Sequence, residues 1–61
     1  MDTGFIEVTD GWGTVSVNID LILFVRKQDD GTAMIVLGKE QVISCNESYE
    51  KVMRLIHMNA K

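Results

Sequence analysis

Residues 22–37 read ILFVRKQDDGTAMIVL. Two apolar runs, 22–25 and 33–37, flank the acidic turn signal 29–31. Aspartates followed by glycine favour a tight turn, so the stretch predicts a β-hairpin. A strand that is covered on one face only alternates apolar and polar residues, and neither run does so. Both faces of this hairpin are therefore expected to need a cover.

Further strands are predicted on either side of the hairpin. Alternation of apolar and polar residues indicates two strands before it, joined by a glycine-containing turn at 10–13, and a short one after it. Asn18 and Asp20 favour a tight turn or one turn of helix before the hairpin begins. The five predicted strands are 5–9, 14–17, 22–28, 32–37 and 41–44.

A helix is predicted over residues 47–58, where apolar residues recur at helical spacing. Asn46 is the predicted N-cap, and a capping box beginning at Ser44 is the alternative start. The apolar positions that share one face are Tyr49, Val52, Met53 and Ile56.

These elements predict one domain, 1–61, of the α+β class and mainly β: a small, strongly curved antiparallel sheet of about five strands with a C-terminal helix. One helix covers only one face of the sheet. The other face is covered either because the sheet curls into a barrel or because a second copy packs on it. Cys45 is the only cysteine, so no intrachain disulfide supports this short chain. Self-association is the favoured solution.

The charge balance argues against nucleic acid as the partner. Nine acidic residues oppose six basic ones, giving a net charge of −3, and the basic residues are scattered. The apolar runs are too short to span a bilayer. Residues 1–4 lack the features of a secretory leader, which predicts a cytoplasmic protein.

No catalytic, metal-binding or cofactor-binding set is apparent. Cys45 is either a reactive thiolate at the helix N-terminus or a small buried residue, and the second is favoured because no histidine is near in sequence. His57 suits the end of the helix as a cation rather than as a general base. Asp29 and Asp30 fit a turn better than a calcium loop.

Five residues are predicted to mediate interactions instead. Trp12, between two glycines at a hairpin tip, is either a binding anchor or a side chain folded back onto the sheet edge. The others belong to the apolar hairpin. The set is Trp12, Leu23, Val25, Met34 and Val36.

The chain resembles the small flagellar-operon and swarming proteins of the FlbD/SwrD type. The resemblance runs from the first strand, 5–9, through the segment 18–22. It continues in Thr32 and the strand leading into Gly-Lys, 35–39, and in the Glu-Ser helix start, 47–52. It implies a non-enzymatic cytoplasmic accessory protein associated with motility, and it carries over no binding residue.

The segment from Asp20 to the closing helix also resembles LytTR-type DNA-binding modules. Those modules are longer and more basic than this chain. The sequence therefore predicts a protein-interaction module that self-associates, with a DNA-binding module as the alternative. Arg26, Lys27 and Lys39 would have to converge if the alternative holds.

Overall fold

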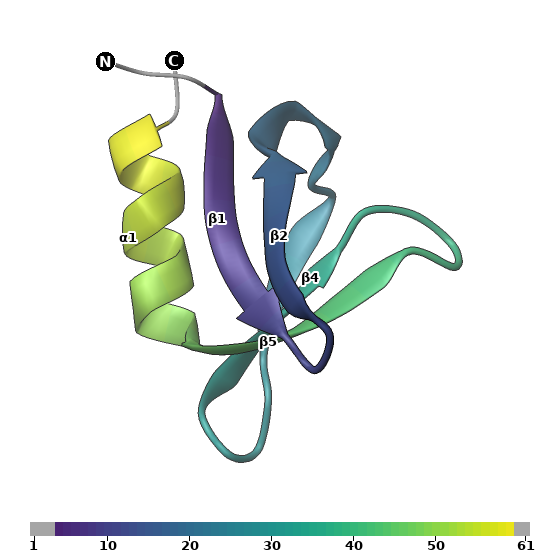
Figure 1. Cartoon of the computed structure of the whole chain (residues 1–61), viewed down its shortest axis with the longest axis vertical. Coiled ribbons are helices and arrows are strands. Elements are labelled where there is room, and N and C mark those ends of the chain that lie inside the picture. Colours follow the sequence, from purple (N-terminus) through teal and green to yellow (C-terminus); the bar gives the residue numbers. More distant parts are fainter. Residues whose placement is uncertain (1–3, 60–61) are drawn as a thin grey trace.

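A computed structural model describes residues 4–59 and confirms the α+β, mainly β architecture (Figure 1). All strand pairs are antiparallel, and the helix follows the last strand. In chain order the elements are β1 Phe5–Asp10, β2 Gly13–Asn18, the 3₁₀ turn η1 Ile19–Leu21, β3 Phe24–Lys27, β4 Thr32–Val36, β5 Val42–Ser48 and α1 Tyr49–Asn59.

The strands form two sheets, where the sequence predicted one strongly curved sheet. The hairpin of β1 and β2 is one sheet, and β3, β4 and β5 in that order make the other. Side chains of β5 join the two. The main-chain N–H of Thr9 donates to Glu47 Oε1 at 2.9 Å, and the Thr9 hydroxyl donates to Glu47 Oε2 at 2.9 Å. The β1–β2 hairpin therefore stays in place beside β5 without a main-chain ladder between them.

The core lies between the two sheets and α1. Val8 of β1, Ile35 of β4 and Val52 of α1 have no exposed surface, so each layer contributes one fully buried aliphatic side chain. Burying a side chain of this size stabilises a fold by about 1.5–3 kcal/mol. The buried core residues of the described part of the chain are Ile6, Val8, Val17, Ala33, Ile35, Cys45 and Val52.

The end of β5 and the start of α1 differ from the prediction. The strand continues to Ser48 rather than ending at 44, and the helix begins at Tyr49 rather than near 47. Asn46 is not the N-cap, because its side-chain amide donates to Asp10 O at 3.2 Å. The Ser48 hydroxyl takes the cap role and accepts the N–H of Lys51 at 3.1 Å. The capping box beginning at Ser44 is likewise wrong.

The connection into β3 also shortens that strand relative to its predicted start at 22. Asn18 caps η1 by accepting the Asp20 N–H at 2.9 Å, which confirms the predicted turn of helix. The N–H of Ile22 then donates to Ile19 O at 3.1 Å and closes the turn. The Leu23 N–H donates to Val36 O of β4 at 2.8 Å, and the regular register with β4 begins at the next residue, Phe24.

Candidate interaction surfaces

The solvent-facing side of the three-stranded sheet carries an apolar row. The register places Phe24 opposite Val36, and Val36 opposite Val42, so one side chain from each strand lies in a line. Ile35, the neighbour of Val36, is fully buried on the other side of the sheet. Phe24 and Val42 are each 48% exposed. Together with half-buried Met34 in the next row, these residues are called the outer face: Phe24, Met34, Val36 and Val42.

The outer face has a polar end. The Arg26 guanidinium lies over the Phe24 ring, 5.7 Å from its centroid, in a cation–π arrangement. Farther along, the Gln28 amide donates to the hydroxyls of Thr32 at 2.8 Å and Ser44 at 3.2 Å. The apolar row is therefore bounded on one side by fixed polar groups, as the rim of an interface commonly is.

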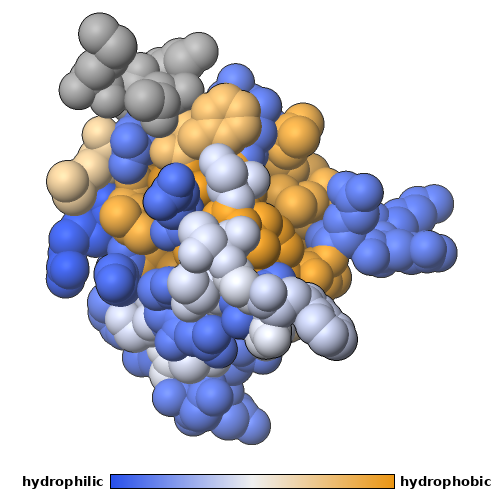
Figure 2. All heavy atoms as spheres, in the orientation of Figure 1, coloured by the Kyte–Doolittle hydropathy of each residue, from blue (hydrophilic) through white to orange (hydrophobic). Residues whose placement is uncertain are grey.

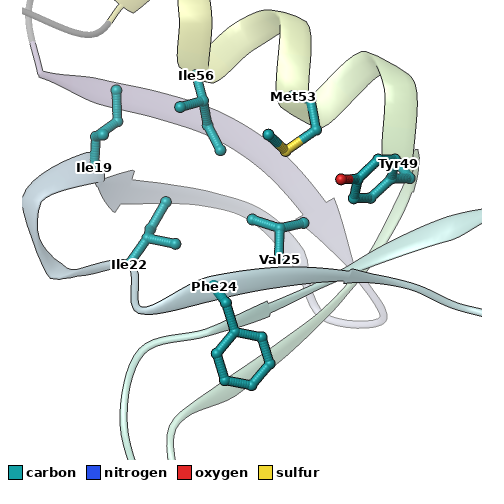
Figure 3. Close-up of a pocket in the computed structure, with 7 residues that line it drawn as sticks. All are labelled: Ile19, Ile22, Phe24, Val25, Tyr49, Met53 and Ile56. Atoms are coloured by element: carbon teal, nitrogen blue, oxygen red, sulfur yellow. The ribbon is translucent and has the colours of Figure 1, made fainter.

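A second apolar feature is a groove of about 250 Å³ between α1 and the segment from η1 to β3. Figure 3 shows Ile22 and Val25 pointing toward Met53 and Ile56 of the helix, whereas the ring of Phe24 points away below β3. Val25 and Phe24 thus belong to opposite sides of the same strand. The residues that line the groove are Ile19, Ile22, Phe24, Val25, Tyr49, Met53 and Ile56.

An ion pair connects β3 to the helix on the groove side. Lys27 Nζ lies 3.0 Å from Glu50 Oε2, and both side chains are more than half exposed. The hydrogen bond from Lys27 holds the pKa of Glu50 below its usual value. Exposed pairs of this kind contribute little stability, but this one directs the lysine toward α1.

The predicted interaction residues do not share one surface. Met34 and Val36 lie on the outer face, whereas Val25 is opposite Ile35 on the core side and lines the groove. Leu23, 67% exposed, immediately precedes β3. Sequence reasoning missed Phe24 and Val42 as members of the outer face. Their apolar character was visible, but only the strand register shows that they align with Val36.

Trp12 lies at the tip of the β1–β2 hairpin and is 96% exposed, so the alternative in which it folds back onto the sheet is wrong. Asp10 Oδ1 accepts the N–H groups of Trp12 at 2.8 Å and Gly13 at 3.1 Å. Gly13 has a φ of +138°, a conformation that residues with a side chain rarely adopt. The turn geometry therefore projects the indole away from both sheets.

Cys45 is a buried residue of β5, 3% exposed, and does not lie at the helix N-terminus. Burial raises its pKa to about 11, and the nearby charges of Glu47 and Asp10 act in the same direction. The reactive-thiolate alternative is wrong, because the side chain is buried within β5 and lies outside α1, which begins at Tyr49.

Asp30 and His57, two other polar residues considered from the sequence, lie in a turn and at the end of the helix. Asp30 accepts from the N–H of Thr32 at 3.0 Å and from its hydroxyl, in the β3–β4 turn. The hydrogen bonds from Thr32 hold the pKa of Asp30 below its usual value. His57 is exposed in the last turn of α1. Within residues 4–59 no three His, Cys, Asp or Glu side chains gather as metal ligands would.

The three basic residues of the DNA-binding alternative are spread over different surfaces. Arg26 lies over Phe24 on the outer side, Lys27 is paired with Glu50 on the helix side, and Lys39 is in the exposed loop between β4 and β5.

Figure 2 shows hydrophilic atoms along the lower edge and at the right of this view, and hydrophobic atoms gathered in its upper half.

No family model, no curated protein and no solved structure matches this chain. None of the helices in the described part, residues 4–59, has the length and apolar character to cross a membrane.

Proposed function

We propose that this chain is a non-enzymatic cytoplasmic protein-interaction module that self-associates through the outer face. The observation that carries the proposal is the apolar row of Phe24, Val36 and Val42, one residue from each strand, on the side of the sheet that faces away from the core. Contiguous exposed apolar residues with a polar rim are typical of protein–protein interaction sites.

The size of the chain supports association. A domain of this length buries a smaller fraction of its unfolded surface than a larger domain does, and its stability is correspondingly marginal. The described part has one buried cysteine and no disulfide, so covalent cross-linking does not stabilise it. Burial of the outer face against a second copy would add apolar area that the monomer leaves in water.

The accessory role is proposed from the resemblance to the FlbD/SwrD-type proteins. It is a role in motility, carried out through binding rather than catalysis. Trp12, presented at a rigid turn, is proposed as a separate contact point for a different partner protein, because large exposed aromatics are frequent anchors of binding energy.

The test is the mass in solution, measured by size exclusion with light scattering over a range of concentrations. The unmodified chain is expected at a multiple of 6.9 kDa. Val42→Glu places a charge in the outer face and is expected to lower that mass. Met58→Glu is the matched control, because Met58 is 69% exposed on α1 and lies off the sheet.

Circular dichroism checks that both variants remain folded. A monomeric unmodified chain at every concentration overturns the self-association. An unchanged mass for folded Val42→Glu overturns the outer face as its site.

A further inference from the structure

Strand β3 has one edge with no strand partner among residues 4–59. In that part of the chain its only neighbour in the sheet is β4. The Gln28 N–H donates to Thr32 O at 2.8 Å, which fixes the alternation of the ladder. Main-chain groups of Phe24 and Arg26 therefore point toward β4, and those of Val25 and Lys27 point to the free side. Such an edge is a template for a strand from another chain.

The charges that would protect this edge are directed away from it. Lysine and arginine on an edge strand commonly prevent pairing with another chain. Here Lys27 is held by Glu50 of α1 at 3.0 Å, and the Arg26 guanidinium lies over the Phe24 ring at 5.7 Å. Beside the edge lies the apolar groove that Val25 lines.

We propose that the free edge of β3 pairs antiparallel with β3 of a second copy, with Val25 opposite Val25 of that copy. This inference rests on the self-association proposed above and adds a contact at the strand edge that is separate from the contact proposed at the outer face. Two copies of one strand pair in a symmetric arrangement around a two-fold axis. The main-chain N–H and C=O groups on the free side of one β3 strand must lie opposite those of the other. The two-fold axis therefore passes through Phe24, Val25 or Arg26.

The charges and hydrogen bonds select Val25 among these three. An axis at Arg26 places two guanidinium groups opposite each other, which is unfavourable. An axis at Phe24 places Leu23 opposite Val25 in both central pairs, and the Leu23 N–H already donates to Val36 O at 2.8 Å. An axis at Val25 moves Leu23 to the outer pairs, opposite Lys27. An axis at Val25 lets both copies exchange N–H and C=O bonds at Val25 and places each Arg26 opposite a Phe24 ring. The two Lys27 residues then lie about 13 Å apart along the strands.

The pairing produces one continuous six-stranded sheet. Because the two-fold axis is perpendicular to the sheet, both α1 helices lie on the same side, and the two grooves meet at the seam. On the opposite side the outer faces of the two copies become one surface of twice the apolar area. The edge contact therefore forms a dimer, and the outer face remains available for further association.

Thiol cross-linking tests the register. In a Cys45→Ala background, Val25→Cys is treated with a short bifunctional thiol reagent, and Val42→Cys is the matched variant. Edge pairing places the two residues at 25 about 5.5 Å apart and the two at 42 about 24 Å apart. The expected result is a cross-linked dimer from Val25→Cys at concentrations where the chain associates.

The outcomes separate this inference from the proposed function. Cross-linking at 42 but not at 25 overturns the edge pairing and leaves association through the outer face in place. A monomeric chain that cross-links at neither position overturns both.

A second measurement uses the unmodified chain, so no variant has to fold. Hydrogen exchange at the Val25 and Lys27 amides is followed by NMR at rising protein concentration. When nine tenths of the molecules are associated, these amides are expected to exchange about tenfold more slowly than in the monomer. The reason is that only the remaining tenth of the molecules, the free monomers, exposes them to solvent. Exchange that is independent of concentration in a chain shown to associate overturns the pairing.

Discussion

The two faces of the three-stranded sheet are built from similar residues but have different environments. On the inner face Ala33 and Ile35 have no exposed surface, whereas on the outer face Phe24 and Val42 remain 48% exposed. The β1–β2 hairpin and α1 supply the cover for the inner face, and no element among residues 4–59 lies over the outer one. Apolar composition therefore does not distinguish a core from a binding surface here. The elements that pack on a face make the distinction.

The largest difference between the faces is expected in stability. Ile35→Ala removes buried methyl groups and leaves a cavity, so the free energy of unfolding should fall by about 2–5 kcal/mol. Val36→Ala, the next residue on the outer face, should cost about 1 kcal/mol or less. Urea titration at a concentration where the chain is monomeric measures both. Equal losses at the two positions would contradict the division into inner and outer faces.

A difference in thiol chemistry is expected next. The pKa of Cys45 is raised from 9.0 to about 11, which lowers its thiolate fraction near pH 8 by about a hundredfold. Cys45 should therefore react with a thiol reagent at least that much more slowly than a cysteine placed at Val42 in a Cys45→Ala chain. Denaturant should remove the difference. Fast labelling of native Cys45 would contradict its burial.

The same pKa shift gives a stability change at high pH. Because the pKa of the Cys45 thiol is higher in the folded state than in the unfolded state, the protonated thiol stabilises the fold, and this contribution is fully present below about pH 9. This contribution should be lost as the pH rises toward 11. Cys45→Ala is the control and should not show this part of the pH dependence.

A smaller effect on stability is expected at Glu47, the β5 residue whose carboxylate accepts hydrogen bonds from Thr9 of β1. Burial raises the pKa of Glu47, but the hydrogen bonds from Thr9 outweigh it and, with the charge of Lys51, hold the pKa below its usual 4.5. Glu47→Ala should lower the free energy of unfolding by about 1 kcal/mol after allowance for solvent exposure. This stability should be lost as the pH falls below about 4.5, since protonation removes the charged acceptor.

Glu50→Gln is the matched control, because it removes an exposed carboxylate that makes one ion pair. Its unfolding free energy should not change measurably. A pH dependence below 4.5 that persists in Glu47→Ala would show that another carboxylate carries it.

The smallest stability effect is expected on the outer face itself. Val42→Ala should change the free energy of unfolding of the dilute monomer by less than about 0.5 kcal/mol, because the side chain is half in water already. The same change should weaken association measurably by light scattering. A clear loss of monomer stability would place Val42 in the core.

The turns and hairpins were predictable from the sequence, because local chemistry determines them. Asp10 and Gly13 form the first turn through side-chain hydrogen bonds and a positive φ. Gly31, with a φ of +90°, allows the second turn. Asn18 caps the helical turn between the hairpins. These features involve residues two or three positions apart, and no distant partner is required.

The boundary between β5 and α1 was decided by the tertiary structure. Asn46 and Glu47 have the local character of a helix start, but Thr9 and Asp10, 36 to 38 positions earlier, offer them hydrogen bonds that an extended chain can reach. These long-range bonds outweigh the local capping preference, and the helix begins after them.

The sequence by itself determined that the strands around residues 22–37 are apolar on both sides, and hence that one side needs an unusual environment. Which residues share that side was decided only by the register, which aligns Phe24 with Val36 and Val42 and turns Val25 to the core. Successive side chains of a strand point to opposite faces of the sheet. A register shift of one residue would therefore exchange the side chains of the inner face with those of the outer face. Contacts between distant strands fix that register, and composition does not.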